Sequence, residues 1–362
     1  MSRDANVGIV GIGVYLPPEV RRNDWWPPEV VERWRQQMAK NIVRPDRDDV
    51  DPASDGVRRA LEAMSEFRDD PFKGAVERRV MPEGMRSSEM ELAAAREALE
   101  RAGIDKGEIG LLLCYGHLPD HLIVPNAPLL HSELGLSQRC ISMGTEAGCN
   151  SFLLQLALAE QMVKSGAVKY ALLIQHSAVL QFVRPEDHHA VWFGDGATAV
   201  IVGRVGAGRG LLAGSHNTDG SMYKGLLGGV PGKRWHTAEE RMVLYVDDKK
   251  VARRMLLNIC DLARQSVREA LEQAGHAPEE VRFYATHQST RWFAEVTRDY
   301  IGLKNARFFD SFTWTASLGA CNIPFMLAMG EREGLLRDGD LVAMHTGGSG
   351  ITWSGMVARW GR

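Results

Sequence analysis

The chain has 362 residues, of which 25% are charged, and its formal net charge is −3. Such a chain can bury a large core, and we expect one compact two-lobed unit. The charge balance gives no support to nucleic-acid binding, which needs a basic surface. No apolar run approaches the roughly 18 residues of a membrane span, and the first residues lack the basic and apolar regions of a signal peptide. We therefore expect a cytoplasmic enzyme that binds no membrane.

Cysteine usage predicts a reduced protein without a structural metal. The five cysteines are at positions 114, 140, 149, 260 and 321. Their number is odd and none forms a C-x-x-C pair, so we expect free thiols and no zinc site. His117 and His121 have a helical i, i+4 spacing, but Pro119 between them breaks the helix that would aim both at one ion.

The first predicted element is a strand, Val7–Leu16. Its Gly8, Gly11 and Gly13 have the order G-x-x-G-x-G, and Pro17-Pro18 follows instead of a helix, which argues against a dinucleotide site. Residues 24–70 then form a charged, tryptophan-bearing excursion that we expect to be partly helical.

Beyond the excursion, hydrophobic periodicity and the positions of glycine predict alternating helices and strands. The predicted helices are 91–103, 126–134, 150–165, 249–274, 289–301 and 318–333. The predicted strands are 109–114, 169–174, 198–205, 281–286, 340–345 and 351–359. Near-continuous apolar strands of this kind are typical of a sheet that is covered on both faces. The order predicts an α/β protein.

An internal repeat divides the chain into two similar halves. Arg96–Gly103 (REALERAG) recurs 172 residues later as Arg268–Gly275 (REALEQAG), and Cys149 has its counterpart in Cys321 at the same offset. A period this long indicates a duplicated αβαβ unit. We expect an N-terminal half, residues 1–205, and a C-terminal half, residues 206–362, with an active site where both contribute loops.

Cys149 is the candidate nucleophile. It falls where a strand and a small-residue turn lead into an apolar helix, and a helix N-terminus favours an anion such as a thiolate. The dipole supplies only about 0.3–1 kcal/mol, so a second group has to assist. The alternative is that Cys149 is a small buried apolar residue, the commoner role of cysteine.

His287 is the candidate second group. It lies at the carboxyl end of the strand 281–286, where open α/β sheets place ligands, and we expect it to open the next helix. A histidine there can take a proton from a thiol or form a hydrogen bond with the substrate. The alternative is a capping or buried histidine, but the repeat puts Cys149 and His287 on equivalent ends of the two halves.

Five motifs in order resemble the thiolase superfamily, and within it β-ketoacyl-acyl-carrier-protein synthase III. Cys149-Asn-Ser-Phe with the helix after it is similar to the family's nucleophile helix. Phe193-Gly-Asp-Gly-Ala197 resembles its F-G-D-G-A turn, and His287-Gln288 its H-Q-A-N motif. Gly348–Trp353 resembles its terminal glycine-rich loop, and Tyr15–Val20 its first strand-to-loop junction.

The resemblance implies a thiolase-like fold of five layers, α-β-α-β-α, and a homodimer. It implies that Cys149 carries an acyl thioester and that His287 acts as base or hydrogen-bond donor. The amides of Cys149 and Ser349 would form the oxyanion hole, and Val124 would reach across the dimer to shape the partner's acyl pocket. No metal or other cofactor is implied; acyl-CoA or acyl-carrier protein is the substrate.

Two departures from the family pattern bear on the reaction. Ser317 stands where the family has its third catalytic residue, an asparagine; Asn322 is near, but the count places it on the following helix. Arg68 and Phe72 stand where the family has the tryptophan and arginine that clasp the adenine of coenzyme A.

We therefore expect an acyltransferase of secondary metabolism that passes its acyl group to an oxygen, nitrogen or activated-carbon acceptor. Two alternatives stay open. One is a decarboxylative Claisen condensing enzyme of the 3-oxoacyl-ACP synthase III type, and the other is a non-catalytic partner subunit of such an enzyme.

Four further residues carry weaker predictions. Asp310 could orient His287 in place of the missing asparagine. Glu146 could contact the catalytic residues without touching the substrate. Asp195, between glycines, is expected to fix a tight turn, and His188 with its neighbour His189 is expected to be solvated in a charged loop.

Overall fold

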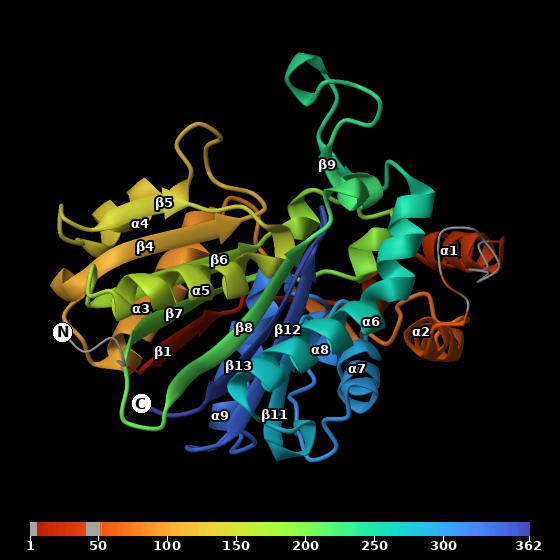
Figure 1. The fold of residues 1–362 in the computed structure, drawn as a ribbon. Helices are drawn as coiled ribbons and strands as arrows, with labels where there is room; N and C mark the ends of the chain where they lie inside the picture. The colour runs from red at the N-terminus through yellow and green to blue at the C-terminus, as the bar shows by residue number, and fades with distance from the viewer. Residues whose placement is uncertain (1–5, 41–50, 52) are drawn as a thin grey trace.

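Two twisted sheets lie face to face in the computed structural model, which describes residues 6–40, 51 and 53–362 (Figure 1). The strand order of the first sheet is β1-β7-β6-β4-β5. Its strands are β1 (Val7–Tyr15), β4 (Ile109–Gly116), β5 (Ile141–Gly144), β6 (Tyr170–Ser177) and β7 (Gly196–Arg204). β4 is parallel to β5 and β6, whereas β7 is antiparallel to β6 and β1.

The second sheet repeats this arrangement. Its order, read in the same direction, is β8-β13-β12-β11, with one parallel pair, β11 and β12, and antiparallel neighbours beyond it. Its strands are β8 (Gly210–Thr218), β11 (Val281–Thr286), β12 (Leu341–Gly348) and β13 (Thr352–Arg359). The matched orders confirm the duplicated core that the repeat predicts. All strands of the first sheet precede residue 205, yet the division of the chain into two domains there stays a prediction.

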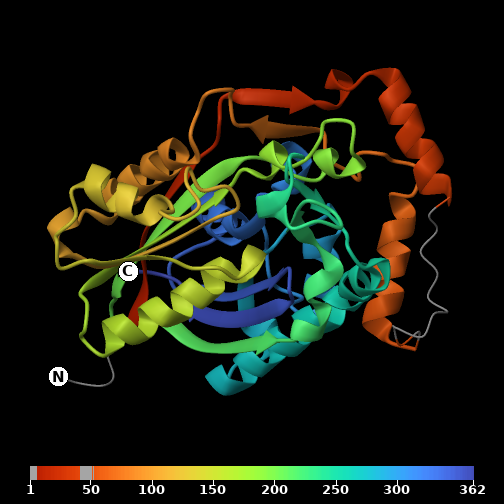
Figure 2. The ribbon, with the colours of Figure 1, turned by 90° about the horizontal axis from the view of Figure 1, so that it is seen from above.

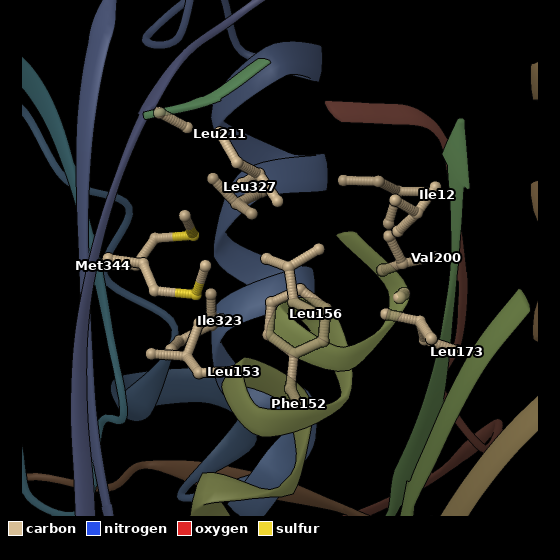
Figure 3. Close-up of a cluster of buried hydrophobic side chains, with 14 of the residues drawn as sticks. Ile12, Phe152, Leu153, Leu156, Leu173, Val200, Leu211, Ile323, Leu327 and Met344 are labelled. Carbon is tan, nitrogen blue, oxygen red and sulfur yellow. The ribbon is translucent and has the colours of Figure 1, made fainter. Parts of the chain in front are cut away.

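Two helices fill the space between the sheets. They are α5 (Ser151–Lys164) and α9 (Asn322–Arg332), and both contact strands of both sheets. In Figure 3, Phe152 and Leu156 of α5 and Leu327 of α9 lie between Val200 on one side and Met344 on the other. Burial on both faces explains why these helices are apolar almost all round.

Further helices cover the two outer faces (Figure 2). α3 (Ser87–Ala102) and α4 (Asn126–Leu134) pack on the first sheet, and α6 (Lys249–Ala274) and α7 (Phe293–Ile301) pack on the second. α3 and α6 are the helices of the sequence repeat, and each ends at a glycine in the left-handed region, Gly103 (φ 63°) and Gly275 (φ 71°). The result is the five-layered α-β-α-β-α fold that the family resemblance implies.

The excursion of residues 24–70 contains two helices, as expected, and residues 41–50 and 52 of it lie outside the described part. The helices are α1 (Pro28–Lys40) and α2 (Asp55–Glu66). Trp26 and Trp34 pack on each other and on Phe72 in a buried aromatic cluster. α2 is fixed to α6, because Ser54 donates a 2.5 Å hydrogen bond to Asp261.

The remaining elements are short. They include two antiparallel strand pairs and one short helix. The pairs are β2 (Glu19–Arg22) with β3 (Glu77–Val80) and β9 (Leu227–Gly229) with β10 (Val243–Tyr245), and the helix is α8 (Phe312–Thr315). None of the described helices is both long enough and apolar enough to cross a membrane.

The structure corrects two local predictions. His287 does not open a helix, because α7 begins only at Phe293. His188 is not solvated: its ring packs between Trp34 and Trp192, and its Nε2 lies 2.6 Å from the carbonyl oxygen of Pro71. Burial lowers the pKa of His188 to about 4.

Gly11 and Gly13 of β1 permit close packing against α3. A Cβ atom on Gly13 would lie 2.0 Å from the carbonyl oxygen of Ala94 and 2.5 Å from the amide nitrogen of Ala98. This contact, and not phosphate binding, is the structural reason for a glycine at that position.

Gly13→Ala should therefore destabilise the fold, by about 3 kcal/mol, because the helix backbone has to move away from the strand. Urea unfolding monitored by circular dichroism measures the change. Gly220→Ala is the matched control, since a Cβ there meets nothing within 4 Å. Equal midpoints for both variants would contradict the packing explanation.

Candidate active site

Cys149 lies in a 3₁₀ turn, Gly148–Asn150, that leads directly into α5. Gly148 opens the turn with a positive φ of 56°, which glycine adopts at little cost. The Ser151 hydroxyl fixes the turn, because it accepts from the amide of Ala147 (3.0 Å) and donates to the carbonyl of Gly148 (2.8 Å). Cys149 is partly exposed, whereas the other four cysteines are buried.

The structure opposes an ionised thiol in the resting protein. Burial raises the pKa of Cys149 to about 12, the negative charge of Glu146 adds to this, and the amide of Cys149 itself acts in the opposite direction. The expected stabilisation of the thiolate by a helix N-terminus is therefore outweighed. Glu146 stands three residues before the nucleophile and accepts a 3.0 Å hydrogen bond from the amide of Gly148.

The loop after β12 packs against the backbone of the Cys149 turn. A Cβ on Gly148 would lie 3.2 Å from the amide nitrogen of Ser349, and one on Gly348 would lie 3.2 Å from the amide nitrogen of Cys149. Thr346 fixes the contact by donating to the Cys149 carbonyl (3.1 Å). The two amides assigned to the oxyanion hole therefore belong to neighbouring pieces of backbone, and that role stays a prediction.

His287 follows β11 directly and is tied to the adjacent strand, since its amide donates to the carbonyl of His345 (3.0 Å). Gln288 anchors the segment: its side-chain oxygen accepts from the amides of Ser311 and Phe312, each at 2.9 Å. Burial lowers the pKa of His287 to about 4, and a hydrogen bond with the Gly319 backbone offsets only part of this. The imidazole is therefore neutral at pH 7.

Asn322, the first residue of α9, is a neighbour of His287 that the sequence did not identify. Its Nδ2 lies 2.7 Å from Nδ1 of His287 and donates to the Ser317 hydroxyl at 3.2 Å. Only the fold shows these two contacts, because which loop a side chain at a helix start reaches depends on the tertiary packing. Ser317 itself is buried beside this amide, and its hydroxyl also accepts from the amide of Gly319 at 3.4 Å.

Two other predicted residues lie elsewhere. Asp310 does not contact His287; its carboxylate pairs with Arg291 (3.2 Å) and accepts from Thr313. Val124 lies on the loop between β4 and α4 with 57% of its surface exposed. The buried carboxylate of Asp195 accepts from the amides of Met81 and Leu180, so it joins its turn to two other segments.

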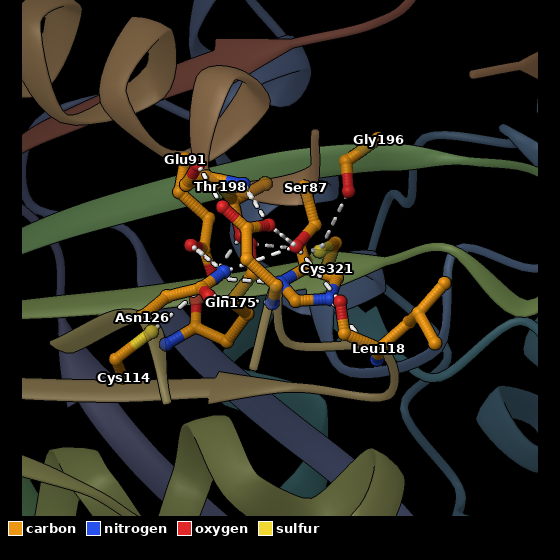
Figure 4. A network of polar contacts seen from close by, with 12 residues as sticks. Ser87, Glu91, Cys114, Leu118, Asn126, Gln175, Gly196, Thr198 and Cys321 are labelled. Carbon is orange, nitrogen blue, oxygen red and sulfur yellow. Dashed lines mark hydrogen bonds and ion pairs between the residues drawn. The ribbon is translucent and has the colours of Figure 1, made fainter. Parts of the chain in front are cut away.

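A buried polar network supports the end of β4 on the outer side of the first sheet (Figure 4). Glu91 of α3 accepts from Asn126 at 2.7 Å and contacts Nδ1 of His176 at 2.6 Å. Nε2 of His176 accepts from the amide of Leu118 at 3.2 Å. Since Leu118 and Asn126 bracket the loop that carries Val124, this network fixes both ends of that loop.

Within residues 6–40, 51 and 53–362, no group of three or more His, Cys, Asp or Glu side chains is arranged to bind a metal ion. The chemistry that the described groups offer is that of a cysteine, a neutral histidine and two backbone amides. This set suits acyl transfer through a thioester.

Comparison with known proteins agrees with this class. Two family profiles match the chain: 3-oxoacyl-[acyl-carrier-protein (ACP)] synthase III over residues 143–220, and the C-terminal domain of the same synthase over residues 271–360. A β-ketoacyl-[acyl-carrier-protein] synthase III of Bacillus pumilus is 27% identical over 99% of this chain and all of its own length. That of Rhizorhabdus wittichii is 29% identical over 79% of this chain and 88% of its own.

Solved structures give the same fold. The synthase III of Thermus thermophilus superimposes with a TM-score of 0.77 at 24% identity and covers 98% of this chain and 99% of its own. A variant of OleA from Xanthomonas campestris gives 0.77 at 22% identity and covers 99% of each chain. Fold and comparisons together define an acyltransferase-type enzyme of the thiolase superfamily. Within it, the chain is similar to the 3-oxoacyl-ACP synthase III proteins.

Glu146→Gln should lower the pKa of the Cys149 thiol, because it removes a neighbouring negative charge. We expect the pH profile of alkylation by iodoacetamide to move to lower pH in this variant. Peptide mass spectrometry measures the rate at Cys149, and Cys149→Ala gives the background from the buried cysteines.

Glu333→Gln, at the far end of α9, removes the same charge and serves as the control. It should leave the alkylation profile in place. An unchanged profile in Glu146→Gln would show that this carboxylate does not act on the thiol.

Proposed function

We propose that the protein is an acyltransferase that works through an acyl thioester on Cys149. It takes an acyl group from acyl-CoA or an acyl-carrier protein and passes it to an oxygen, nitrogen or activated-carbon acceptor in secondary metabolism. One observation carries the proposal: the Cys149 turn contacts the backbone of Gly348 and Ser349. Close to this contact, Asn322 contacts both His287 and Ser317.

Both half-reactions balance without a redox partner. In the first, the Cys149 sulfur attacks the donor thioester, a new carbon–sulfur bond replaces the old one, and the thiol proton leaves with the donor's thiol. In the second, the acceptor attacks the acyl carbon and the bond from that carbon to the Cys149 sulfur breaks. The O–H, N–H or activated C–H proton of the acceptor returns to the sulfur, and the free thiol is restored. Amides at Cys149 and Ser349 would bind the oxyanion in each step, and one such donor contributes about 2.7–4 kcal/mol.

Ser317 supports transfer of an intact acyl group over decarboxylation. Asparagine offers two N–H donors, whereas serine offers one O–H and has a shorter side chain. The nearby amide of Asn322 does not replace the missing one, because its Nδ2 contacts His287 and Ser317 and its oxygen accepts from the amide of Leu318. Decarboxylative Claisen condensation is the second candidate, and the names of the relatives support it.

A non-catalytic partner subunit is the third candidate. Such a subunit has no physical need for a partly exposed Cys149 within a turn that contacts the Ser349 backbone. The exposure of Cys149 and its contact with this backbone favour the catalytic alternatives.

We also propose a homodimer, as the family resemblance implies. Leu122, Ile123 and Val124 are 62%, 95% and 57% exposed on one loop. Beside it β5 is an edge strand of the first sheet, and its Ile141 and Met143 are 47% and 46% exposed. An unpaired strand edge next to exposed apolar side chains fits an interface with a second copy.

Incubation with a competent acyl-CoA donor should add one acyl mass to the protein, and Cys149→Ala should abolish the adduct. Intact-protein mass spectrometry with a panel of donors measures this and also identifies the acyl chain. Ser151→Ala keeps the thiol and is the matched control for a change in the same turn. An adduct that persists in Cys149→Ala would remove Cys149 from the mechanism.

Malonyl-CoA labelled in its free carboxyl group tests the position of Ser317. We expect a malonyl-enzyme that releases little carbon dioxide, and Ser317→Asn should raise the release, by up to about 10²-fold, if the new amide reaches the thioester carbonyl. Ser317→Ala controls for loss of the hydroxyl, and circular dichroism confirms that the variants fold. Release at the rate of turnover in the unchanged protein would establish the Claisen alternative instead.

A further inference from the structure

We propose that His176, on β6, is a pH-dependent anchor for the loop of residues 118–125, which follows β4. The neutral imidazole of His176 holds the start of this loop through Leu118, and a proton on Nε2 of the ring releases it. The proposal concerns residues outside the candidate active site, and it follows from the partners of the two ring nitrogens.

The ring of His176 is buried and has a partner at each nitrogen. It packs on the backbone of Gly116, its neighbour in β4, where a Cβ atom would lie 1.7 Å from Cε1 of the ring. Nδ1 lies 2.6 Å from Oε1 of Glu91, and Nε2 lies 3.2 Å from the amide nitrogen of Leu118. The side chains of His176 and Glu91 are 1% and 0% exposed, so water does not compete freely for these contacts.

The contact with Leu118 requires a neutral ring. A backbone N–H can only donate, so Nε2 must offer a lone pair to it. A neutral imidazole has one N–H, which is then on Nδ1 and donates to Glu91. A protonated ring has a hydrogen on both nitrogens, and its Nε2–H would face the N–H of Leu118 across the same 3.2 Å. Protonation therefore replaces a hydrogen bond by two opposed donors.

The surroundings of Glu91 direct the proton to the ring of His176 (Figure 4). Oε1 of Glu91 accepts from Nδ1 of His176 and from the thiol of Cys114 at 3.2 Å, and Oε2 accepts from Asn126 at 2.7 Å. The Asn126 amide is fixed in this orientation, because its oxygen accepts from the amide of Asp120 at 2.8 Å. A proton on Glu91 would oppose these donors, whereas the ionised carboxylate compensates a positive charge on the ring.

The other titratable groups identified near the ring, among the described residues, keep their charge state when the pH falls. The backbone carbonyl of His176 accepts a hydrogen bond from the ring of His117, and burial lowers the pKa of His117 to about 4. Burial raises the pKa of Cys114 well above its usual range and that of Cys321 to about 12, and the charge of Glu91 adds to both shifts.

A second set of contacts limits the release to the start of the loop. The Ser87 hydroxyl lies 2.8 Å from the carbonyl oxygen of Leu118, and Asp120 accepts from the Ser88 hydroxyl at 2.5 Å. Burial opposes ionisation of Asp120, but its hydrogen bonds outweigh this effect and lower its pKa. These contacts persist at low pH, so loss of the His176 contact loosens the loop without unfolding the sheet.

The consequence for assembly rests on the proposed homodimer, whereas the anchor itself does not. The loop carries the exposed side chains of Leu122, Ile123 and Val124. A second copy has to bind them in one arrangement, and a loop with a released start loses more conformational freedom on binding. We therefore expect the dimer to weaken as the pH falls and His176 takes up a proton.

Hydrogen–deuterium exchange of the full-length protein at about pH 8 and about pH 5.5, a range in which histidine changes its charge, tests the anchor. Mass spectrometry follows peptides that contain Leu118, and the rates are corrected for the effect of pH on the chemical exchange step. We expect about tenfold faster exchange at the lower pH, because the Leu118 amide loses its acceptor. Peptides from β7 are the internal reference and should not change.

Two substitutions of His176 separate the pH-dependent anchor from a purely structural role. His176→Gln puts an oxygen near the position of Nε2, so it can accept from Leu118 but does not titrate, and we expect slow exchange at both pH values. His176→Asn puts its amide near Nδ1, keeps a donor toward Glu91 and leaves Leu118 without an acceptor, so we expect fast exchange at both. Circular dichroism confirms that the variants fold.

Equal exchange at the two pH values in the unchanged protein would overturn the proposal without any variant. A pH response that persists in His176→Gln would also overturn it. Sedimentation velocity at the same pH values tests the assembly, and the dissociation constant should rise at low pH in the unchanged protein but not in His176→Gln. A chain that shows the exchange response but is monomeric at both pH values keeps the anchor and removes the homodimer.

Discussion

The close approach of two helix starts between the sheets is the constraint on which this site depends. α5 and α9 lie largely buried between the sheets, and each begins at a short 3₁₀ turn. Those turns, at Gly148 and Gly319, contact each other and have nearly equal φ values, 56° and 57°. The duplicated sheets fix the two helices, and the helices in turn place Cys149 beside the loop ends of the opposite half.

The two copies have diverged in how they use the same positions. Cys149 is partly exposed, whereas its counterpart Cys321 is buried and directs its Sγ toward the carbonyl of Gln175 at 3.3 Å. The residue after each cysteine is an asparagine. Asn150 donates to the hydroxyls of Thr352 and Ser354, and Asn322 donates toward His287 and Ser317. One copy thus presents a nucleophile and the other orients the side chains around it.

An uncharged Cys149 and an uncharged His287 follow from this burial. Desolvation disfavours both the thiolate and the imidazolium, so a preformed ion pair of Cys149 and His287 is not stable in the free protein. Hydrogen-bond donors that are already oriented then have to stabilise charge only when it develops on the substrate. Such a site is suited to thioester exchange, in which the proton count of the enzyme is the same before and after each half-reaction.

The sequence by itself determined the fold class, the duplication, the nucleophile turn and the approximate positions of most core elements, because these depend on local periodicity, glycine positions and a long repeat. It did not predict β8, and it misplaced the starts of α3, α7 and α9 by four residues each. It placed Ser317 by counting, and that residue does lie beside His287. Only the tertiary structure decided which partner His287 has. Asp310, the predicted partner, pairs with Arg291, and Asn322, which the count had set aside on a helix, fills the place. Side-chain direction at a helix start, and the pKa values that burial imposes, arise from contacts between distant segments, which no local pattern contains.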